Sequence, residues 1–195
     1  MNPAPEAPHK TAARLSRAVF LDRDGVLIED VDHLTSVDQI EILPRVPEAL
    51  ARLRAAGWKL VIATNQSVVA RGWITEAGLR EIHRVLLDRL RARGAEIDAV
   101  YYCPHHPDGA VAAFRGACEC RKPNPGMLFQ AANDHHLDLA GSIVIGDALT
   151  DVEAGHRAGC RTVLLGGDGG RGGRASPDYV ANDLEGAADW ILKRV

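Results

Sequence analysis

A short apolar run over residues 19–21 stops at two carboxylates, Asp22 and Asp24, and Gly25 follows at once. The run is too apolar to hold acids in its interior, so it predicts a buried strand with the acids at its end. In open parallel sheets, ligands bind beyond the carboxyl ends of the strands. Two acids at i and i+2 of an extended segment point to the same side, where one could act as nucleophile or metal ligand and the other as proton carrier. The alternative is a surface turn, which Asp and Gly also favour.

Predicted strands alternate with predicted helices along the rest of the chain. This alternation is typical of a parallel sheet with right-handed crossovers. We therefore expect a three-layer, Rossmann-like α/β fold built on a parallel sheet. The strands are expected at 19–21, 58–63, 97–102, 142–145 and 161–165, with an edge strand at 178–180, and the helices at 47–56, 75–93, 127–136, 151–158 and 184–192.

Length and charge limit the number of domains and the partners. A chain of 195 residues suits one domain, expected over residues 17–195. Residues 1–16 are rich in Pro and Ala without an apolar core, and they predict a disordered tail that is not a signal peptide. The net charge of −3 favours neither nucleic acid nor an anionic membrane as a partner. No apolar run approaches the roughly 20 residues that span a bilayer.

The lack of an export signal predicts a cytoplasmic protein, and we expect a monomer. In that compartment the four cysteines should be reduced unless they bind a metal. Segment 166–173 holds six glycines and is expected to be mobile.

Polar residues also follow other predicted strands. Thr64 follows the second strand, Asp147 follows the fourth with Asp151 behind it, and Lys122 lies in the loop before the fourth. Acids, a hydroxyl and an ammonium at one sheet edge are what phosphoryl transfer requires. The acids would hold a divalent cation, and Mg²⁺ suits the site because every candidate ligand is oxygen. Each residue taken singly also suits a structural role, such as a turn, a solvated charge or a helix start.

Five motifs together carry a resemblance to a known family. They are Asp-Arg-Asp-Gly at 22–25, Thr-Asn-Gln-Ser at 64–67, Ala-Arg-Gly at 70–72, Cys-Pro-His-His-Pro at 103–107 and Cys-Glu-Cys-Arg-Lys-Pro at 118–123. The chain resembles the haloacid dehalogenase (HAD) superfamily, and within it the D-glycero-D-manno-heptose 1,7-bisphosphate phosphatases, which share a branch with histidinol-phosphate phosphatases. The resemblance implies a Mg²⁺-dependent phosphatase with a HAD-type sheet and a small-molecule sugar phosphate as substrate.

The resemblance also implies roles for the catalytic residues. Asp22 would be the nucleophile that forms an aspartyl-phosphate. Asp24 would protonate the leaving sugar oxygen and then deprotonate the attacking water, since each step leaves its carboxyl in the protonation state that the next step needs. Thr64 and Lys122 would hold the transferring phosphoryl group.

The metal site is implied in the same way. Mg²⁺ would be bound by Asp22, the main-chain oxygen of Asp24 and Asp147. Asp151 would instead orient Lys122 or a metal-bound water.

The substrate site is implied to be open. The spacing of the motifs leaves room for a flap near residues 30–40 but for no cap domain. Arg121 could fork onto a second phosphate or a hydroxyl of the substrate, and Arg23 is expected to point away from the acids, toward the protein. Exposure to solvent remains the alternative for the flap residues. The other substrate-binding residues expected are Asp30, Asp32 and His33 on the flap, and Asn65, Gln66 and Ser67 after the second strand.

The loop over residues 103–120 carries a candidate zinc site. Cys103, His105, Cys118 and Cys120 offer three thiolates and one imidazole, which is a closed tetrahedral set for Zn²⁺. The one-residue gaps are tighter than those of common zinc fingers, so a reduced loop without metal is the alternative. The resemblance includes this loop and implies a structural zinc that orders it. Cys160 stands apart and is expected to be a buried small hydrophobe.

Three functions remain open on the sequence. They are a heptose-bisphosphate phosphatase, a histidinol-phosphate phosphatase with the same machinery, and a zinc-stabilised binding module that has lost catalysis. Complete acids, threonine and lysine argue against the third. Four positions depart from the family pattern and bear on specificity: Val68, Val69, Asn124 and Ala148.

Overall fold

The computed structural model describes residues 15–166 and 175–194. The strands of this part form one parallel sheet in the order β3-β2-β1-β4-β5-β6, so the predicted parallel α/β sheet is confirmed. The predicted edge strand is confirmed as β6, which pairs only with β5. The strands are β1 (Ala18–Leu21), β2 (Lys59–Asn65), β3 (Ala99–Cys103), β4 (Ile143–Gly146), β5 (Arg161–Leu165) and β6 (Tyr179–Ala181).

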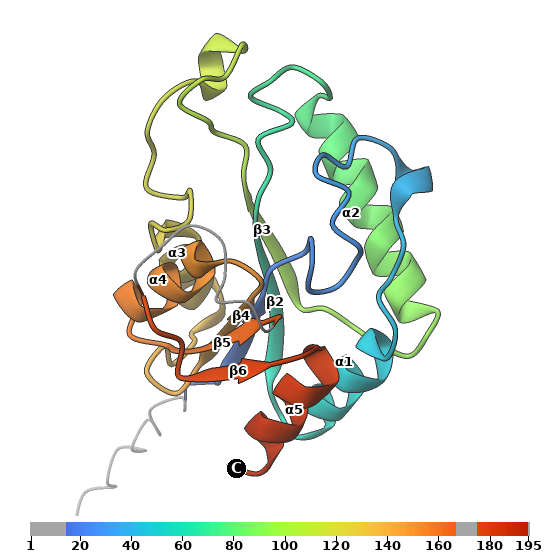
Figure 1. Cartoon of the computed structure of the whole chain (residues 1–195), viewed down its shortest axis with the longest axis vertical. Helices are drawn as coiled ribbons and strands as arrows, with labels where there is room; N and C mark the ends of the chain where they lie inside the picture. Colours follow the sequence, from blue (N-terminus) through green and yellow to red (C-terminus); the bar gives the residue numbers. More distant parts are fainter. Residues whose placement is uncertain (1–14, 167–174, 195) are drawn as a thin grey trace, which may run out of the picture.

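Helices cover both faces of the sheet (Figure 1). Successive side chains of a strand point to opposite faces. Accordingly, Phe20 of β1 packs in the cluster that includes α3 and α4, and Val19 packs in the larger cluster on the opposite face. These two buried clusters make the three layers that the sequence predicts. One face is covered by α3 (Gly126–His135) and α4 (Leu149–Arg157), the other by α1 (Val46–Ala55), α2 (Glu76–Arg91) and α5 (Leu184–Leu192).

Element boundaries differ from the prediction by a few residues. The strand β2 runs on to Asn65, because Thr64 and Asn65 still pair with β3. The helix α4 begins at Leu149, and Asp151 lies in its first turn and accepts a hydrogen bond from the backbone N of Ala148. The predicted start at residue 151 was late because an acid three residues beyond the N-cap is a capping signal, not a first residue.

The chain ends also differ from the prediction in one place. Ser16 was expected in the disordered tail, yet its backbone N donates to the carbonyl of His136 and its carbonyl accepts from the backbone N of Asp138, at 3.1 and 2.8 Å. Ser16 is therefore held beside Leu137 in a parallel bridge and is not part of a disordered tail. Residues 1–14 of the predicted tail and residues 167–173 of the glycine segment lie outside the described residues.

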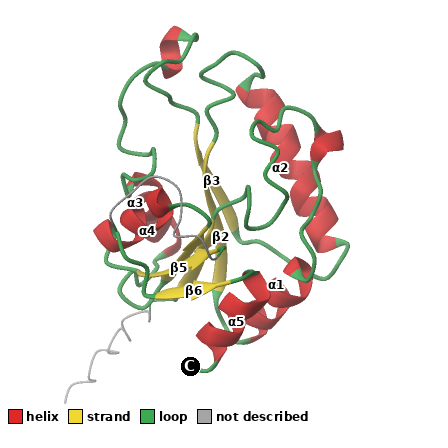
Figure 2. Cartoon of the chain, in the orientation of Figure 1, coloured by secondary structure: helices red, strands yellow, loops and turns green. Residues whose placement is uncertain are grey.

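Long loops extend from the carboxyl ends of β1, β2 and β3 (green in Figure 2). The flap after β1 contains the short helix η1 (Val37–Gln39), and Arg89 of α2 donates to the carbonyl of Ile40 at 2.8 Å. The loop after β3 contains the short helix η2 (Ala112–Phe114). Between residues 15 and 166 the chain forms no separate cap domain over the sheet edge, as the motif spacing predicts. Among the described helices, none has the length and apolar character to cross a membrane.

Candidate active site

Three acids from two strand ends gather at the carboxyl edge of the sheet. Asp22 directly follows β1, Asp147 follows β4, and Asp151 lies in the first turn of α4. One carboxylate oxygen of each lies within 4.8 Å of the others. The structure therefore brings together Asp22 and Asp147, as predicted, and adds Asp151 to the same group.

Lys122 enters this group from the loop before α3. Its Nζ lies 3.0 Å from Oδ2 of Asp22 and 2.5 Å from Oδ1 of Asp151, and it donates to the carbonyl of Ala63 at 2.7 Å. Burial lowers the pKa of Lys122, but the negative charges of Asp151 and Asp22 outweigh this and hold the pKa above its ordinary value. The ammonium therefore stays charged beside Asp22, and Asp151 contacts it as the resemblance implies.

Asn65 fastens the backbone of this lysine to β2. Its Nδ2 donates to the carbonyl of Lys122 at 3.1 Å, and its Oδ1 accepts from the backbone N of Lys122 at 3.0 Å. The sequence predicts a substrate contact for Asn65. In the structure its amide is instead occupied by the Lys122 peptide groups.

The Asp24 carboxylate is held apart from the other three acids. It accepts hydrogen bonds from Arg23 Nη2 at 2.9 Å and from Gln66 Nε2 at 2.7 Å. This leaves its main-chain oxygen, not its side chain, for the metal role that the resemblance implies. Burial raises the pKa of Asp24, Arg23 lowers it and the nearby Asp22 carboxylate raises it, and the result lies above the ordinary value. A raised pKa favours the protonated form that a general acid needs.

Arg23 differs from its prediction. It does point into the protein, where it is fully buried, but its guanidinium reaches back to Asp24. Its Nη2 also donates to Gln66 Oε1 at 2.8 Å, and its Nη1 lies 3.2 Å from Nε2 of His83. Burial and the charge of Arg23 lower the pKa of His83 to about 3, so His83 is neutral and accepts this hydrogen bond. No sequence pattern signalled His83, which comes from the middle of α2.

Two glycines allow the acids to approach the backbone. Gly25 has a φ of +70°, and a Cβ at this position would lie 2.5 Å from Oδ2 of Asp147. A Cβ on Gly146 would collide with the side chain of Asp151. Both positions exclude any larger residue, so the Asp-x-Asp-Gly and Gly-Asp pairs of the sequence follow from the packing of the carboxylates.

The electrostatics of Asp147 indicate a place for a cation. Burial and the negative charge of Asp22 raise the pKa of Asp147 to about 6, and Asp30 of the flap adds to this effect. Oxygen-only ligands of like charge are the set that Mg²⁺ fits. Asp22 and Asp147 therefore suit Mg²⁺ by both their spacing and their mutual repulsion.

Thr64 and Gln66 form part of one hydrogen-bonded unit. The Thr64 hydroxyl is buried at the end of β2 and accepts from Nε2 of Gln66 at 3.0 Å. Gln66 therefore links Thr64 to Asp24 and Arg23 from within the site. Ser67 is half-buried, and its carbonyl accepts from the backbone N of Arg71 at 2.9 Å.

The flap residues lie further out. Asp32 is exposed, with a φ of +63°, and its backbone N donates to Oδ1 of Asp30 at 3.0 Å. The ring of His33 meets the ring of Trp73 edge to face, with centroids 4.6 Å apart. The flap thus contacts the loop that follows β2. It lies beside the acids and does not form a separate domain over them.

The four predicted zinc ligands converge. The sulfur of Cys103 lies 3.5 Å from that of Cys118 and 3.0 Å from that of Cys120, and Nδ1 of His105 lies 3.5 Å from the sulfur of Cys120. All four ligand atoms lie within 4.8 Å of one another, and the four cysteines of the chain are free of disulfides. Three thiols and one imidazole at this spacing fit tetrahedral Zn²⁺. Cys160 is buried elsewhere, as expected.

Arg121 connects the cluster of cysteines and histidine to the acid site. Its Nη1 donates to the carbonyl of His105 at 3.1 Å, and the next residue is Lys122. Burial lowers the pKa of His106, and the positive charges of Arg121 and Arg71 lower it further. Arg71 and His106 were not expected near the site. Their only sequence signal was membership of the Ala-Arg-Gly and Cys-Pro-His-His-Pro motifs.

Comparisons with known proteins agree with this geometry. Residues 119–187 match the HAD-hydrolase-like family. The D-glycero-beta-D-manno-heptose-1,7-bisphosphate 7-phosphatase of Salmonella typhi is 40% identical over 175 residues, which cover 90% of this chain and 89% of that protein. The D-glycero-D-manno-heptose-1,7-bisphosphate 7-phosphatase of Thermosynechococcus vestitus is 42% identical over 187 residues, 89% of this chain and 94% of that protein.

A solved structure is similar over nearly the whole chain. It is the D,D-heptose 1,7-bisphosphate phosphatase of B. bronchiseptica in complex with magnesium and phosphate. The similarity has a TM-score of 0.81 and 38% identity, and it covers 92% of this chain and 99% of the other.

Proposed function

We propose that the protein hydrolyses the 7-phosphate of D-glycero-D-manno-heptose 1,7-bisphosphate and leaves the heptose 1-phosphate. The reason is that the chain belongs to the D-glycero-D-manno-heptose-1,7-bisphosphate 7-phosphatase family of HAD-like hydrolases. The observation that carries this proposal is the contact of Lys122 Nζ with both Asp22 and Asp151, with Asp24 held separately by Arg23 and Gln66. A binding module would not need a carboxylate and an ammonium buried together at a sheet edge.

In the first step a carboxylate oxygen of Asp22 forms a bond to phosphorus, and the bond from phosphorus to the sugar oxygen breaks. Asp24 gives its proton to that oxygen, which leaves as a hydroxyl. The raised pKa of Asp24 supports this role, because the proton must be present before the step. Lys122 and the Thr64 hydroxyl hold the phosphoryl oxygens while charge moves across them.

In the second step water attacks the phosphorus of the aspartyl-phosphate. Asp24, now a carboxylate, takes the proton of that water, and the bond from phosphorus to Asp22 breaks to release inorganic phosphate. The residues that would hold Mg²⁺ are Asp22, Asp147 and the main-chain oxygen of Asp24, and the ion would supply positive charge toward the phosphoryl oxygens. Asp151 keeps Lys122 in place through both steps.

The second phosphate of the substrate would meet the positive side of the site. Arg121 and Arg71 carry positive charge that acts on His106: burial lowers the pKa of His106 first, and the charges of the two arginines lower it further. A planar guanidinium can bind a phosphate through two parallel hydrogen bonds. Zn²⁺ would be held by Cys103, His105, Cys118 and Cys120. It would fix the position of the His105 carbonyl, which accepts a hydrogen bond from Arg121. The flap residues Asp30, Asp32 and His33, together with Ser67, remain proposed contacts for sugar hydroxyls.

Release of inorganic phosphate tests the proposal. The heptose 1,7-bisphosphate, histidinol phosphate and several sugar monophosphates are compared with and without Mg²⁺, and kcat/KM is measured for each. We expect the bisphosphate to give the highest value and Mg²⁺ to be required. A higher value for histidinol phosphate would refute the substrate assignment, and no turnover of any substrate with Mg²⁺ would refute the enzyme.

We also propose that the protein acts as a monomer in the cytoplasm. The support for this compartment is the gathering of free thiols into one metal-ligand set, which a reducing environment preserves. Sedimentation velocity tests the first part, since a monomer of 21.0 kDa and a dimer separate clearly. Cell fractionation tests the second.

A further inference from the structure

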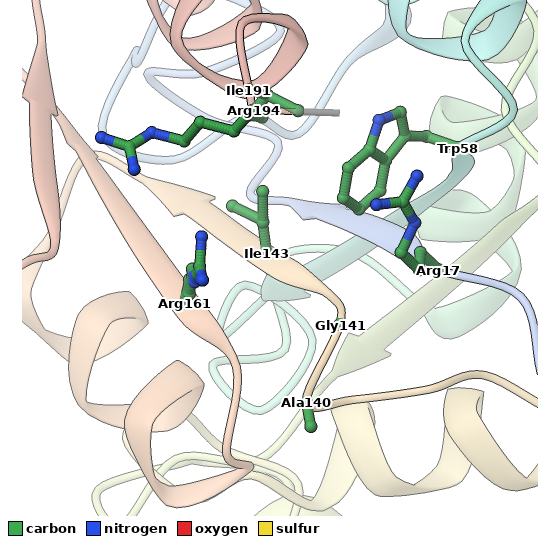
Figure 3. A pocket seen from close by; sticks show the side chains of 8 residues that line it. All are labelled: Arg17, Trp58, Ala140, Gly141, Ile143, Arg161, Ile191 and Arg194. Carbon is green, nitrogen blue, oxygen red and sulfur yellow. The ribbon is translucent and has the colours of Figure 1, made fainter.

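A cavity of about 170 Å³ lies at the edge of the sheet opposite to the acids. The residues around it precede or begin the strands: Arg17 comes before β1, Trp58 before β2, Gly141 before β4, and Arg161 is the first residue of β5. Arg194, just beyond α5, closes one side (Figure 3). This cavity therefore shares no residue with the proposed catalytic site.

Three arginines from separate elements line this cavity without acidic partners. In the described part of the chain, no carboxylate forms an ion pair with Arg17, Arg161 or Arg194. Other surface arginines do form ion pairs, as in the contacts of Arg45 with Glu185 at 2.6 Å and of Arg52 with Asp189 at 2.5 Å. The guanidinium of Arg17 instead lies 4.5 Å from the ring centroid of Trp58. The side chain of Asp138 lies beside Gly141 and Arg17, but it forms no ion pair with Arg17, so the three guanidiniums outnumber the one nearby carboxylate.

The inner wall of the cavity is mainly apolar. Ile143 is 5% exposed and Trp58 is 4% exposed. The indole Nε1 of Trp58 is buried and has no hydrogen-bond acceptor among the described residues. Figure 3 shows Arg161 and Arg194 on one side of Ile143, and Arg17 against the Trp58 ring on the other side. Positive groups therefore border an apolar centre on two sides.

We propose that this cavity binds a small dianion of the phosphate class, either inorganic phosphate or a phosphomonoester. Guanidinium groups bind phosphate oxygens in a planar, two-point geometry, and a dianion would offset the repulsion among three like charges. The volume is below the roughly 300 Å³ of pockets for drug-sized ligands, so the ligand has few heavy atoms. An organic group on the phosphate would contact Ile143 and Trp58.

The indole N–H signals of the three tryptophans provide a local test by ¹⁵N NMR. The full chain is titrated with inorganic phosphate at constant ionic strength, with the signal of Trp58 assigned through Trp58→Phe. We expect a saturable shift of the Trp58 signal. The signal of Trp73, which lies beside the flap, reports separately on binding at the catalytic edge.

Paired variants decide whether the arginines cause the shift. Arg161→Ala with Arg194→Ala should weaken binding at Trp58 at least tenfold. The matched control, Arg91→Ala with Arg93→Ala, removes the same charge from α2 and the turn after it and should bind as the parent does. Arg161→Gln repeats the test with a single neutral change that disturbs the fold least. An equal shift in the cavity variants and the control, or no saturable shift at all, would overturn the proposal.

Two further titrations separate the sources of the ligand. Methylphosphonate, which cannot be hydrolysed, mimics a phosphomonoester. Tighter binding of methylphosphonate than of inorganic phosphate favours a phosphomonoester, and the reverse order favours free phosphate. If sodium chloride produces the same shift, the arginines only attract ions in general and the proposal fails.

Discussion

The side-chain amide of Asn65 bonds both backbone polar groups of Lys122, donating to its carbonyl at 3.1 Å and accepting from its N–H at 3.0 Å. Asn65 is the last residue of β2, and Lys122 lies 57 residues later in a loop. These two hydrogen bonds therefore fix the position of the loop relative to β2. They thereby set the distance between Nζ of Lys122 and Asp22. A polar residue at a strand end, which suggests a substrate contact, here positions Lys122, the residue that we propose holds the phosphoryl group.

Asn65→Ala should slow catalysis without removing any group that touches substrate. Loss of both hydrogen bonds frees the Lys122 backbone, and a displacement of about 1 Å near the reacting atoms costs on the order of 10²-fold in rate. We expect kcat to fall by about 10- to 100-fold and the free energy of unfolding to fall by about 1–3 kcal/mol. Steady-state kinetics and urea unfolding measure these changes. Asn133→Ala, on the exposed side of α3, should alter neither; an unchanged kcat for Asn65→Ala would argue against the positioning role.

Asp22→Asn should abolish turnover while the fold persists. The amide is a poor nucleophile, so we expect kcat to fall by more than about 10³-fold. The protein should remain folded because Lys122 keeps its contact with Asp151. Phosphate release and circular dichroism check the two statements. Asp38→Asn, on the exposed flap helix η1, is the matched control and should retain parental activity. Activity near that of the parent in Asp22→Asn would disprove the nucleophile assignment.

Magnesium affinity should fall as the pH falls through about 6. The pKa of Asp147 is raised to about 6 by burial and by Asp22, so below this pH the metal-free carboxyl is protonated and Mg²⁺ must displace the proton. We expect the apparent Kd for Mg²⁺ to rise by about tenfold per pH unit below that value. Calorimetric titration at pH 5 and pH 7.5 measures this change. An affinity independent of pH would contradict the role of Asp147 as a ligand.

The same shift has a consequence for stability. A carboxyl whose pKa in the folded protein lies above its ordinary value of 3.8 binds its proton more tightly in the folded state. The metal-free protein should therefore lose stability as the pH rises from about 4 to about 6, and Mg²⁺ should restore it. Thermal unfolding across this range, with and without Mg²⁺, follows both effects. Asp147→Asn should weaken them together.

Cys118→Ser should release zinc and lower the melting temperature. One of four ligands is lost, and the loop over residues 103–120 is too long to stay ordered without a metal or a core of its own. We expect KM for the bisphosphate to rise more than kcat falls, because Arg121 is anchored on the carbonyl of His105. Zinc content by atomic emission and steady-state kinetics test this. Cys160→Ser changes a buried cysteine outside the set and should keep its zinc; equal zinc content in the two variants would remove the structural-metal proposal.

Much of the fold follows from local patterns. Most strands were predictable because each is a short apolar run that stops at a polar residue or a glycine. The helix α2 was predictable from Thr75 as its cap and from apolar residues at helical spacing. The convergence of Asp22 and Asp147 was also predictable, because parallel strands end at one edge. Boundaries shifted where pairing continued past the apolar run, as in β2.

The hydrogen-bond partners of the individual polar residues were harder to predict from the sequence. Thr64, Asn65 and Gln66 are adjacent and equally polar. Nevertheless, Thr64 is hydrogen-bonded to Gln66, which also bonds Asp24, whereas Asn65 bonds the backbone of Lys122. Arg23 was expected to point away, since neighbours on a strand alternate, but its side chain is long enough to fold back onto Asp24. His83 comes from 60 residues away and carried no local signal.

The order of residues was therefore enough to predict the parallel sheet, the edge where the acids meet and the gathering of three cysteines and one histidine into a cluster, because backbone periodicity and ligand chemistry act over short stretches of chain. The pairing of Asn65 with Lys122, the return of Arg23 to Asp24 and the three arginines around Trp58 arise only in the folded molecule. Each depends on the packing of segments that are distant in the chain and on side-chain reach, neither of which a one-dimensional pattern contains.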